Sequence, residues 1–304
     1  MKPVGWIGAA LLVVSAAVLA QDAPEGTSAE KLEGTLKKIR DSGVVNIGYR
    51  EASFPFSYTV VGGSRPIGYS IELCQEIVDD ISAALDGREL EVKYVPVTAE
   101  TRIQAIVSGH VDLECGSTTN NIERQKQVAF SPIFFVAGTK LMVRRDSPIK
   151  SYRDLTGKVV AVTAGTTNEQ EMRRLSDQFE LGINLMVGRD HDESYQNVAT
   201  GKAAAFATDD ALLYGFIARK KSQRDYIVVG DYLSYDPYGI MYRRNDPQMK
   251  QVVDGTFRRL AESRGLEDIY VRWFQRRLPT GEKLDLPMSA QLREIFRVLG
   301  LTEE

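Results

Sequence analysis

A run of small hydroxyl residues followed by an arginine is the first feature of this sequence with a chemical interpretation. Residues 115–124 read Cys-Gly-Ser-Thr-Thr-Asn-Asn-Ile-Glu-Arg, and they place Ser117 and Thr119 where a predicted strand passes into a helix start. Backbone N–H groups at a helix start favour an anion. Arg124 can hold a carboxylate through two parallel hydrogen bonds. The run therefore indicates an anion site, although an ordinary helix cap with a surface arginine is the simpler explanation for this segment alone.

The same chemistry recurs in the second half of the chain. Residues 163–167 read Thr-Ala-Gly-Thr-Thr and follow a predicted apolar strand over 159–162. Glycine permits a close backbone approach, and the threonines can cap the next helix. Such caps occur in many α/β proteins, so the pattern gains weight only from its matching place in a second strand–helix series. Thr167 is thus a candidate partner for the same ligand.

An acidic pair ends a strand of small apolar residues over 203–207. A carboxylate of Asp209 or Asp210 can accept hydrogen bonds from an ammonium group. Because adjacent side chains point in different directions, we expect at most one of them to face a ligand. Capping of the following helix is the alternative role, and one residue can fill both.

Three further residues complete the candidate site. Arg50 follows a predicted strand, Arg102 begins a predicted helix and His191 lies in the segment 188–192. Taken singly, each is more often a solvated charge or a loop residue. His191 has no nucleophile beside it in the sequence, so general-base catalysis is the less favoured interpretation. We predict no catalytic residue, metal ligand or cofactor.

The elements that must position these residues alternate between strand and helix. Apolar residues recur at helical spacing between Ile71 and Leu85, and short apolar runs separated by turn residues indicate strands. This alternation predicts largely parallel sheets with crossover helices. In the first half we expect a helix over 27–40 with Thr27 and Glu30 as a capping box and a stop at Gly43, strands over 44–49, 90–97 and 111–115, and helices over 71–85 and 102–108.

A second series of strands and helices predicts a second lobe. Ligands of open α/β sheets bind beyond the carboxyl ends of the strands, so two facing lobes form one site between them. We expect lobe 1 over 27–136 plus 237–304 and lobe 2 over 137–236, with chain crossings near Val136–Thr139 and Gly230–Asp236. The elements of the second series are strands over 159–162, 203–207, 226–229 and 238–243, a helix over 168–179, and a helical final third over 246–299 with Trp273 and Phe274 as a core anchor.

The first residues predict export from the cytoplasm. Lys2 precedes an apolar run over 4–20 that ends in small residues, which is typical of a secretory signal peptide cleaved after Ala20. An uncleaved anchor is the alternative, but the run is short for a membrane span. No cysteine follows that bond, so a lipid anchor there is not available. We therefore predict residues 1–20 as a signal peptide and a periplasmic location.

Composition excludes some classes of function. The chain has 38 basic and 41 acidic residues, a formal net charge of −3, which offers no electrostatic footprint for nucleic acid.

Cys74 lies on an apolar helix face and Cys115 ends a strand. We favour two buried thiols over a disulfide for them, although an oxidising compartment permits pairing. The expected protein is a monomer.

These segments resemble the polar amino acid-binding proteins of ABC transporters, solute-binding protein family 3. The resemblance runs from about residue 30 to residue 290, and the Cys-Gly-Ser-Thr-Thr-Asn-Asn run is fairly specific. Further segments are similar to the glutamate/aspartate-binding subgroup. The family segments are Glu114 to Asn121, Glu123-Arg124-Gln125, Phe130-Ser131-Pro132, Gly157 to Val160, Gly165-Thr166-Thr167 and Asp209 to Leu213, and the subgroup segments are Tyr49-Arg50-Glu51, Pro55-Phe56-Ser57, Arg102-Ile103 and Asp190-His191.

The resemblance implies a type II periplasmic binding protein, with two α/β lobes, a hinge and an interlobe ligand cleft. One departure is Ala99, where the family pattern has a serine three residues before Arg102; it removes a hydroxyl donor. The implied roles are Arg124 with Ser117, Thr119 and Thr167 for the ligand α-carboxylate, Asp209 for the α-ammonium, and Arg50, Arg102 and His191 around a side-chain carboxylate.

Charge counting supports an acidic ligand without reference to the family. A zwitterionic amino acid head needs one cation and one anion, which Arg124 and Asp209 supply. Two arginines and His191 then remain, and burying these cations without an anion is costly. L-Glutamate or L-aspartate is therefore the expected ligand, captured by closure of the lobes and passed to an ABC transporter permease.

Two other interpretations stay open. One is a periplasmic cyclohexadienyl dehydratase, an enzyme that resembles these proteins and converts arogenate or prephenate; Glu123 or His191 would be its acid. The other is a ligand-sensing partner of a receptor, which differs only in what the protein binds next.

Overall fold

The computed structural model describes residues 1, 31–60, 62–63 and 65–301. The chain divides into a leading segment, Met1–Leu32, and a body, Glu33–Glu304, and only the body is considered below. The predicted signal peptide, Thr27 and Glu30 lie outside the described residues. Residues 31–33 are not helical, so the first helix, α1, spans Gly34–Ser42 and begins later than the capping-box pattern predicts. It ends at Gly43, as expected.

Lobe 1 is built on a five-stranded sheet of order β4-β1-β5-β14-β6. β1 pairs in parallel with β4 and β5, whereas β14, which comes from the last third of the chain, runs antiparallel to β5 and β6. Helices α2 and α8 contact each other in this lobe. The elements are β1 (Val44–Tyr49), β4 (Glu91–Pro96), β5 (Leu113–Glu114), β6 (Val128–Phe130), β14 (Met241–Arg243), α2 (Tyr69–Ala84), α3 (Arg102–Val107), α4 (Ile122–Gln125) and α8 (Pro247–Glu262), with the short hairpin β2 (Ala52–Ser53) and β3 (Ser57–Tyr58).

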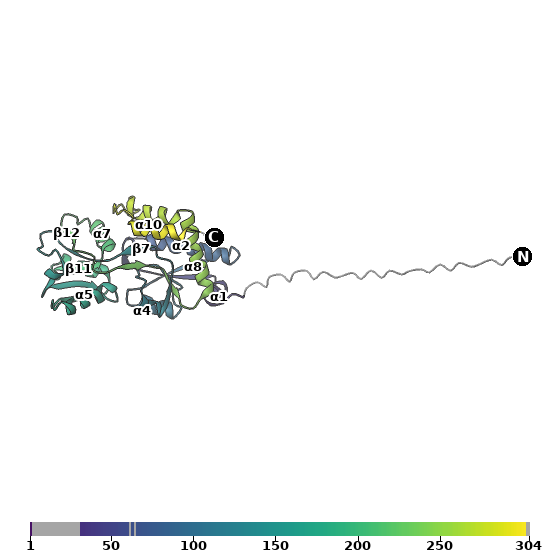
Figure 1. Cartoon of the computed structure of the whole chain (residues 1–304), viewed down its shortest axis with the longest axis horizontal. Helices are drawn as coiled ribbons and strands as arrows, with labels where there is room; N and C mark the ends of the chain where they lie inside the picture. The colour runs from purple at the N-terminus through teal and green to yellow at the C-terminus, as the bar shows by residue number, and fades with distance from the viewer. Residues whose placement is uncertain (2–30, 61, 64, 302–304) are drawn as a thin grey trace. The chain divides into compact units, whose positions relative to one another are not determined.

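Lobe 2 is built on a second five-stranded sheet, of order β10-β9-β11-β8-β12. Its two faces carry separate apolar clusters, one that includes Met172 and Leu175 from α5 and one that includes Val198 from α6 and Phe216 from α7. Figure 1 shows α5, α7, β11 and β12 at one end of the body and α1, α2 and α8 at the other. The elements are β8 (Thr139–Arg144), η1 (Tyr152–Leu155), β9 (Val159–Thr163), α5 (Thr167–Gln178), β10 (Asn184–Gly188), α6 (His191–Ala199), β11 (Ala205–Asp209), α7 (Asp210–Arg219) and β12 (Tyr226–Val229).

Two antiparallel strands connect the lobes. β7 (Phe135–Ala137) pairs with β13 (Asp236–Tyr238), with Ala137 opposite Asp236 and Phe135 opposite Tyr238. The chain enters the second sheet at Thr139 and rejoins the first at Met241. The predicted strand over 238–243 is therefore two strands, because Gly239 and Ile240 separate β13 from β14.

The final third is helical only in part. α8 is followed by α9 (Gly265–Tyr270), a short π-helix, η2 (Val271–Gln275), and α10 (Ala290–Leu299), and residues 276–289 between the last two are not helical. The predicted anchor is buried: Phe274 stacks on Phe135 and Tyr270. Tyr238 packs against Phe135 in the same aromatic cluster, which fixes the connecting strand to lobe 1.

The two cysteines form a disulfide, so the prediction of two free thiols is wrong. Cys74 of α2 and Cys115, directly after β5, have Cα atoms 6.3 Å apart, and both are fully buried. Cys74 was expected on an apolar helix face and Cys115 at the end of a strand, and the disulfide shows that this face and this strand end lie together. The helix face and the strand end were predictable separately, whereas their contact depends on how α2 lies on the sheet.

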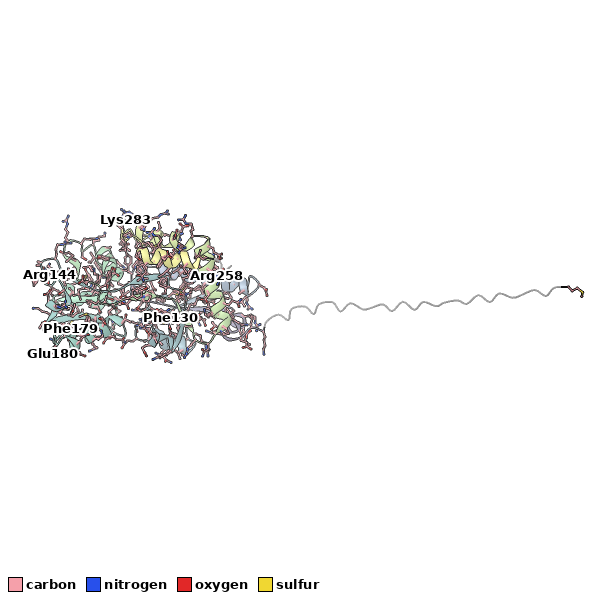
Figure 2. All side chains as sticks on the ribbon, in the orientation of Figure 1. Phe130, Arg144, Phe179, Glu180, Arg258 and Lys283 are labelled. Carbon is pink, nitrogen blue, oxygen red and sulfur yellow. A yellow bond between two sulfur atoms is a disulfide. The ribbon has the colours of Figure 1, made fainter. Side chains whose placement is uncertain are left out.

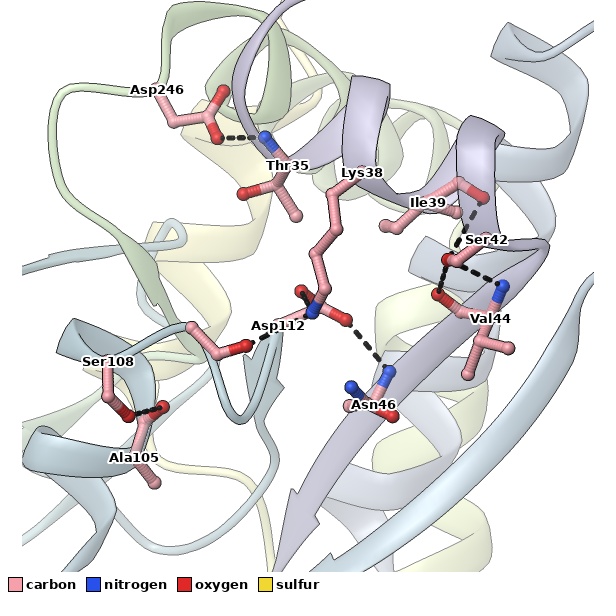
Figure 3. A network of polar contacts seen from close by, with 11 residues as sticks. Thr35, Lys38, Ile39, Ser42, Val44, Asn46, Ala105, Ser108, Asp112 and Asp246 are labelled. Atoms are coloured by element: carbon pink, nitrogen blue, oxygen red, sulfur yellow. Dashed lines mark hydrogen bonds and ion pairs between the residues drawn. The ribbon is translucent and has the colours of Figure 1, made fainter.

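Two buried aspartates join the start of the body to distant elements (Figure 3). Asp246 accepts a hydrogen bond from Thr35 N (2.7 Å), which Figure 3 shows. It also accepts from Met249 N (3.2 Å), so one carboxylate caps both α1 and α8. Asp112 accepts from Lys38 Nζ (2.7 Å) and from Asn46 N (2.9 Å), which ties α1 to β1. Capping and charge-assisted bonds of this kind stabilise the edge of lobe 1 from which β1 leads to Arg50.

Candidate functional site

Arg124 is buried within the short helix α4 (Ile122–Gln125). Its backbone N–H donates to Asn121 Oδ1 (2.9 Å), which caps the helix. The guanidinium donates to Thr119 O (2.9 Å) and, across the lobes, to Gly165 O (3.4 Å), and the residue is only 7% exposed. Burial, followed by the charge of Arg102, lowers the pKa of Arg124 to about 9. The site therefore favours an anion beside this cation.

Asp209 ends β11 and is buried on the lobe 2 side. Its carboxylate accepts from Asn168 Nδ2 (2.8 Å) and from the hydroxyl of Tyr238. Burial, with the nearby charge of Asp236 second, raises the pKa of Asp209 to about 8. Asp210 has a different partner, the Tyr232 hydroxyl at 2.8 Å, so the adjacent acids do point apart. Asp209 makes no side-chain cap to α7, so its carboxylate does not fill the capping role.

The three residues predicted around the ligand side chain, Arg50, Arg102 and His191, are each only 2% exposed. Arg102 donates to Thr118 Oγ1 (2.5 Å) and to Ser117 O (3.3 Å). His191 Nδ1 lies 2.8 Å from Thr163 Oγ1. Burial, then the charges of Arg50 and Arg102, holds the pKa of His191 well below 6.5, so the imidazole is neutral near neutral pH.

Glu114 is a buried carboxylate that the sequence analysis did not place in the site. Its Oε2 accepts a hydrogen bond from Thr118 Oγ1 (2.6 Å), which in turn accepts one from Arg102. Thr118 therefore links Glu114 to Arg102 through two hydrogen bonds. A Cβ at Gly116 would lie 2.4 Å from Glu114 Oε1 and 2.8 Å from Arg50 Cγ. Glu114 and Arg50 thus converge on one point, where only glycine fits.

Unpaired polar atoms gather around these groups. Ordinary charges, such as those of Arg144, Glu180, Arg258 and Lys283, extend from the surface of the body (Figure 2). The cations of the site are buried instead, and buried polar atoms normally have hydrogen-bond partners. Within the described part of the chain, the site atoms that are buried without such a partner are Arg50 Nη1, Arg102 Nε, Glu114 Oε1 and Ser117 Oγ.

Two threonines and one aspartate meet where the lobes meet. Thr119 Oγ1 of lobe 1 and Thr167 Oγ1 of lobe 2 both donate to Asp236 Oδ1, at 3.0 and 2.8 Å, and lie 3.3 Å apart. Close by, Gly165 packs so tightly on lobe 1 that a Cβ there would lie 2.8 Å from the Glu100 nitrogen and 2.9 Å from the Ala99 oxygen. The structure thus brings the two hydroxyl-rich loops together.

The model of the bacterial extracellular solute-binding proteins, family 3, matches residues 45–276. The chain belongs to this family. A relative from Pseudomonas aeruginosa, an L-glutamate/L-aspartate-binding protein, is 41% identical over 285 residues, which cover 93% of this chain and 94% of the relative. A glutamate/aspartate import solute-binding protein from Escherichia coli (strain K12) is 35% identical and covers 95% of each chain.

Solved structures agree with the fold. An ancestral amino acid-binding protein, described as a precursor of cyclohexadienyl dehydratase, superposes with a TM-score of 0.69 at 27% identity and covers 80% of this chain and 100% of its own. The chain has the two-lobed type II fold of the periplasmic amino acid-binding proteins, as the resemblance implied. Among the residues that the structure describes, no helix of this family 3 protein is long and apolar enough to cross a membrane.

Sequence reasoning missed two acidic members of the site, Glu114 and Asp236. A signal for Glu114 existed, because an acid in a short strand between other strands is rare unless it has a buried partner. Asp236 precedes Pro237, and an Asp-Pro pair indicates a turn rather than a ligand site. The remaining missed contacts, Asn168 and Tyr238 to Asp209, depend on side chains that meet only in the folded protein.

Proposed function

We propose that this family 3 protein captures L-glutamate or L-aspartate by closure of its lobes and delivers it to the permease of an ABC transporter. The Pseudomonas and Escherichia relatives carry this ligand pair in their names and match the chain over almost its whole length. The residues implied by the resemblance supply the matching chemistry: Arg124 for the α-carboxylate and Asp209 for the α-ammonium.

The net charge around Arg50 and Arg102 is the main support for an acidic ligand. Glu114 is the buried carboxylate that acts on both cations, and the partly exposed Asp190 acts less strongly on Arg50. Because His191 is neutral and Asp209 is assigned to the ligand ammonium, the buried groups in this part of the site have a net formal charge of about +1. One ligand side-chain carboxylate neutralises it. A glutamine amide leaves a buried positive charge without an anion, and a lysine side chain adds another. The preference therefore follows from counting charges in a place without water.

Closure accounts for the contacts between lobes. We propose lobe 1 as residues 27–136 plus 237–304 and lobe 2 as 137–236, with β7 and β13 as the hinge. The guanidinium of Arg219 in α7 lies 4.8 Å from the ring centre of Tyr58 and donates to Thr59 O (2.8 Å). Together with the Arg124 bond to Gly165, these contacts support a closed arrangement that a bound ligand would stabilise further.

The location and the partners follow from the family and the leading residues. The family is extracellular by description, and we propose that residues 1–20 act as a signal peptide that directs the protein to the periplasm. We propose a monomer without a cofactor, whose macromolecular partner is the permease rather than nucleic acid.

A dehydratase is the second candidate, because a solved structure described as a precursor of such an enzyme shares the fold. An elimination of that kind needs an acid positioned at the leaving group. Glu123 pairs with Lys126 and its side chain is 79% exposed, and neutral His191 is hydrogen-bonded to Thr163. Neither is a suitable acid, so we propose a non-enzymatic protein. Incubation with arogenate or prephenate, followed by chromatography for the aromatic product, tests this; turnover would contradict it.

A thermal-shift screen of amino acids and dicarboxylates tests the proposed ligand. A ligand that binds only the folded state raises the apparent stability by about 2.7 kcal/mol at a hundredfold excess over its Kd. We expect L-glutamate and L-aspartate to raise the Tm, and glutamine, lysine and arginine to leave it unchanged. A shift with glutamine or lysine and none with the acidic pair would contradict the proposal.

Binding should also release a proton from Asp209. With its pKa raised to about 8, Asp209 is mostly protonated at pH 7 in the unliganded body. Because the folded protein holds this proton more tightly than the unfolded chain, the protonated Asp209 contributes to the free energy of unfolding in full below the unfolded pKa of 3.8. This contribution falls as the pH rises from 3.8 and is lost above the folded pKa of about 8. A ligand ammonium favours the ionised form, so glutamate affinity should increase from pH 6 to about 8 and then level off. Calorimetry in buffers of different ionisation enthalpy measures the proton release, and Asp209→Asn should abolish it.

A further inference from the structure

The hydroxyl protons of Thr119 and Thr167 are already committed to Asp236. A threonine hydroxyl has one proton to donate and lone pairs with which to accept. Both hydroxyl oxygens lie within donating distance of Asp236 Oδ1, at 3.0 and 2.8 Å, and 3.3 Å from each other. Because a carboxylate is a stronger acceptor than a neutral hydroxyl, both protons go to Asp236. Each hydroxyl therefore offers its lone pairs to a ligand, and lone pairs attract an ammonium group rather than a carboxylate.

We propose that Asp236 is a positioning residue of the ammonium subsite: it orients the Thr119 and Thr167 hydroxyls so that their lone pairs, together with Asp209, receive the ligand's ammonium. This inference rests on the proposed function and deepens it. An ammonium group has three N–H donors, and the two threonine oxygens with the Asp209 carboxylate supply three acceptors. The ligand α-carboxylate is then left to Arg124 and to backbone N–H groups, which replaces the carboxylate role that the resemblance implied for the Thr119 and Thr167 hydroxyls.

Asp236 is held firmly enough for this role. It is 2% exposed and lies in β13, opposite Ala137 of β7. Its second carboxylate oxygen accepts from Ser234, whose hydroxyl oxygen also accepts from Thr139 N (2.9 Å). Both oxygens of Asp236 are therefore engaged, and the carboxylate cannot turn away from the threonines without losing bonds on both sides.

The same contacts link ligand recognition to the hinge. Asp236 belongs to a strand that connects the lobes, and its two threonine partners come one from each lobe. The acceptor set is complete only when Thr167 has moved next to Thr119. Closure thus brings the lobe 1 acceptor, Thr119, together with the lobe 2 acceptors, Thr167 and Asp209, around an ammonium group. A ligand without an ammonium gains nothing from this set.

The test compares glutamate with glutarate, which has two carboxylates and no ammonium, on Asp236→Asn. An asparagine amide can donate to the threonine oxygens and so release their protons toward the ligand. Because hydrogen bonds to charged groups are worth about 1.5–3 kcal/mol, we expect glutamate to bind about 10- to 100-fold more weakly. We expect glutarate to change by less than about threefold, since none of its groups uses these acceptors. Titration calorimetry measures both.

Two further variants separate orientation from general damage. Asp231→Asn removes the same charge from an exposed position in the same connecting segment, and we expect it to leave both affinities unchanged. Thr167→Val keeps Asp236 but removes one oriented hydroxyl at a partly exposed helix start, so it should reproduce the selective loss of glutamate even if the Asp236 variant does not fold.

Equal weakening of glutamate and glutarate in Asp236→Asn, or in Thr167→Val, would overturn the inference, because it would indicate a structural role alone. Unchanged glutamate affinity in both variants would overturn it as well. If the unaltered protein fails to bind glutamate, the proposed function itself is wrong, and that result is seen before any variant is made.

Discussion

Arg124→Ala is expected to weaken glutamate binding by about 2–5 kcal/mol, because truncating one partner of a buried charge pair leaves the other charge without compensation. The guanidinium is buried, and its neighbours Thr119 O and Gly165 O are acceptors that cannot replace it toward a carboxylate. Its bond to Gly165 is also one of the contacts between the lobes. The variant therefore loses both the anion partner and part of the closed state. Titration calorimetry with glutamate measures the loss.

Arg189→Ala is the matched control for that experiment. Arg189 lies two residues before His191, but its side chain is 83% exposed and its ion pairs to Asp190 and Glu193 are 3.7 and 3.5 Å long. Removing this exposed charge should change glutamate affinity by less than about 0.5 kcal/mol. If Arg124→Ala bound glutamate as tightly as Arg189→Ala does, Arg124 would not be the carboxylate partner.

Replacing Cys74 and Cys115 together by alanine should lower the free energy of unfolding by about 4 kcal/mol, mainly because the unfolded chain gains freedom. The two residues are separated by 41 positions, a loop whose closure is entropically costly in the unfolded state. For a chain of this size the loss corresponds to a fall in Tm of about 8–16 °C. Scanning calorimetry of the unliganded protein measures it.

The disulfide variant also separates stability from recognition. Cys115 directly precedes Gly116 and Ser117, yet neither cysteine is among the residues proposed to bind the ligand. Glutamate should therefore bind the folded variant with little change in affinity and raise its Tm. A fall in unfolding free energy below about 1 kcal/mol would contradict the assignment of a stabilising disulfide, since typical values are 2–4 kcal/mol.

The sequence was informative wherever function depends on one local segment. Arg50, Arg124 and Asp209 stand at the ends of strands or the starts of helices, and such positions are visible from apolar runs and turn residues. The disulfide, by contrast, depends on the packing of α2 against the end of β5, and no local pattern encodes that contact. The roles assigned to these residues are predictions that the ligand titrations test.

The two missed acids illustrate opposite limits of local reasoning. Glu114 can be recognised in the sequence as an acid within a predicted strand. Its link to the site depends on the hydrogen bonds that join it through Thr118 to Arg102 in the folded protein. Asp236 precedes a proline, which indicates a turn, and this pattern gives no sign that Asp236 accepts hydrogen bonds from Thr119 of lobe 1 and Thr167 of lobe 2. The sequence alone predicts three arginines and one aspartate in the site. The folded site adds two carboxylates, and the excess positive charge persists only around Arg50 and Arg102.

The most direct test of the account is a calorimetric comparison of L-glutamate with L-glutamine on the unaltered protein. The two ligands are nearly equal in size and differ in one charge, so they report on the net charge around Arg50, Arg102 and Glu114. We predict that glutamine binds more weakly by about 3–5 kcal/mol, the cost of leaving a buried charge without its partner. Equal affinities, or tighter binding of glutamine, would contradict the claim that this site is built for a second carboxylate.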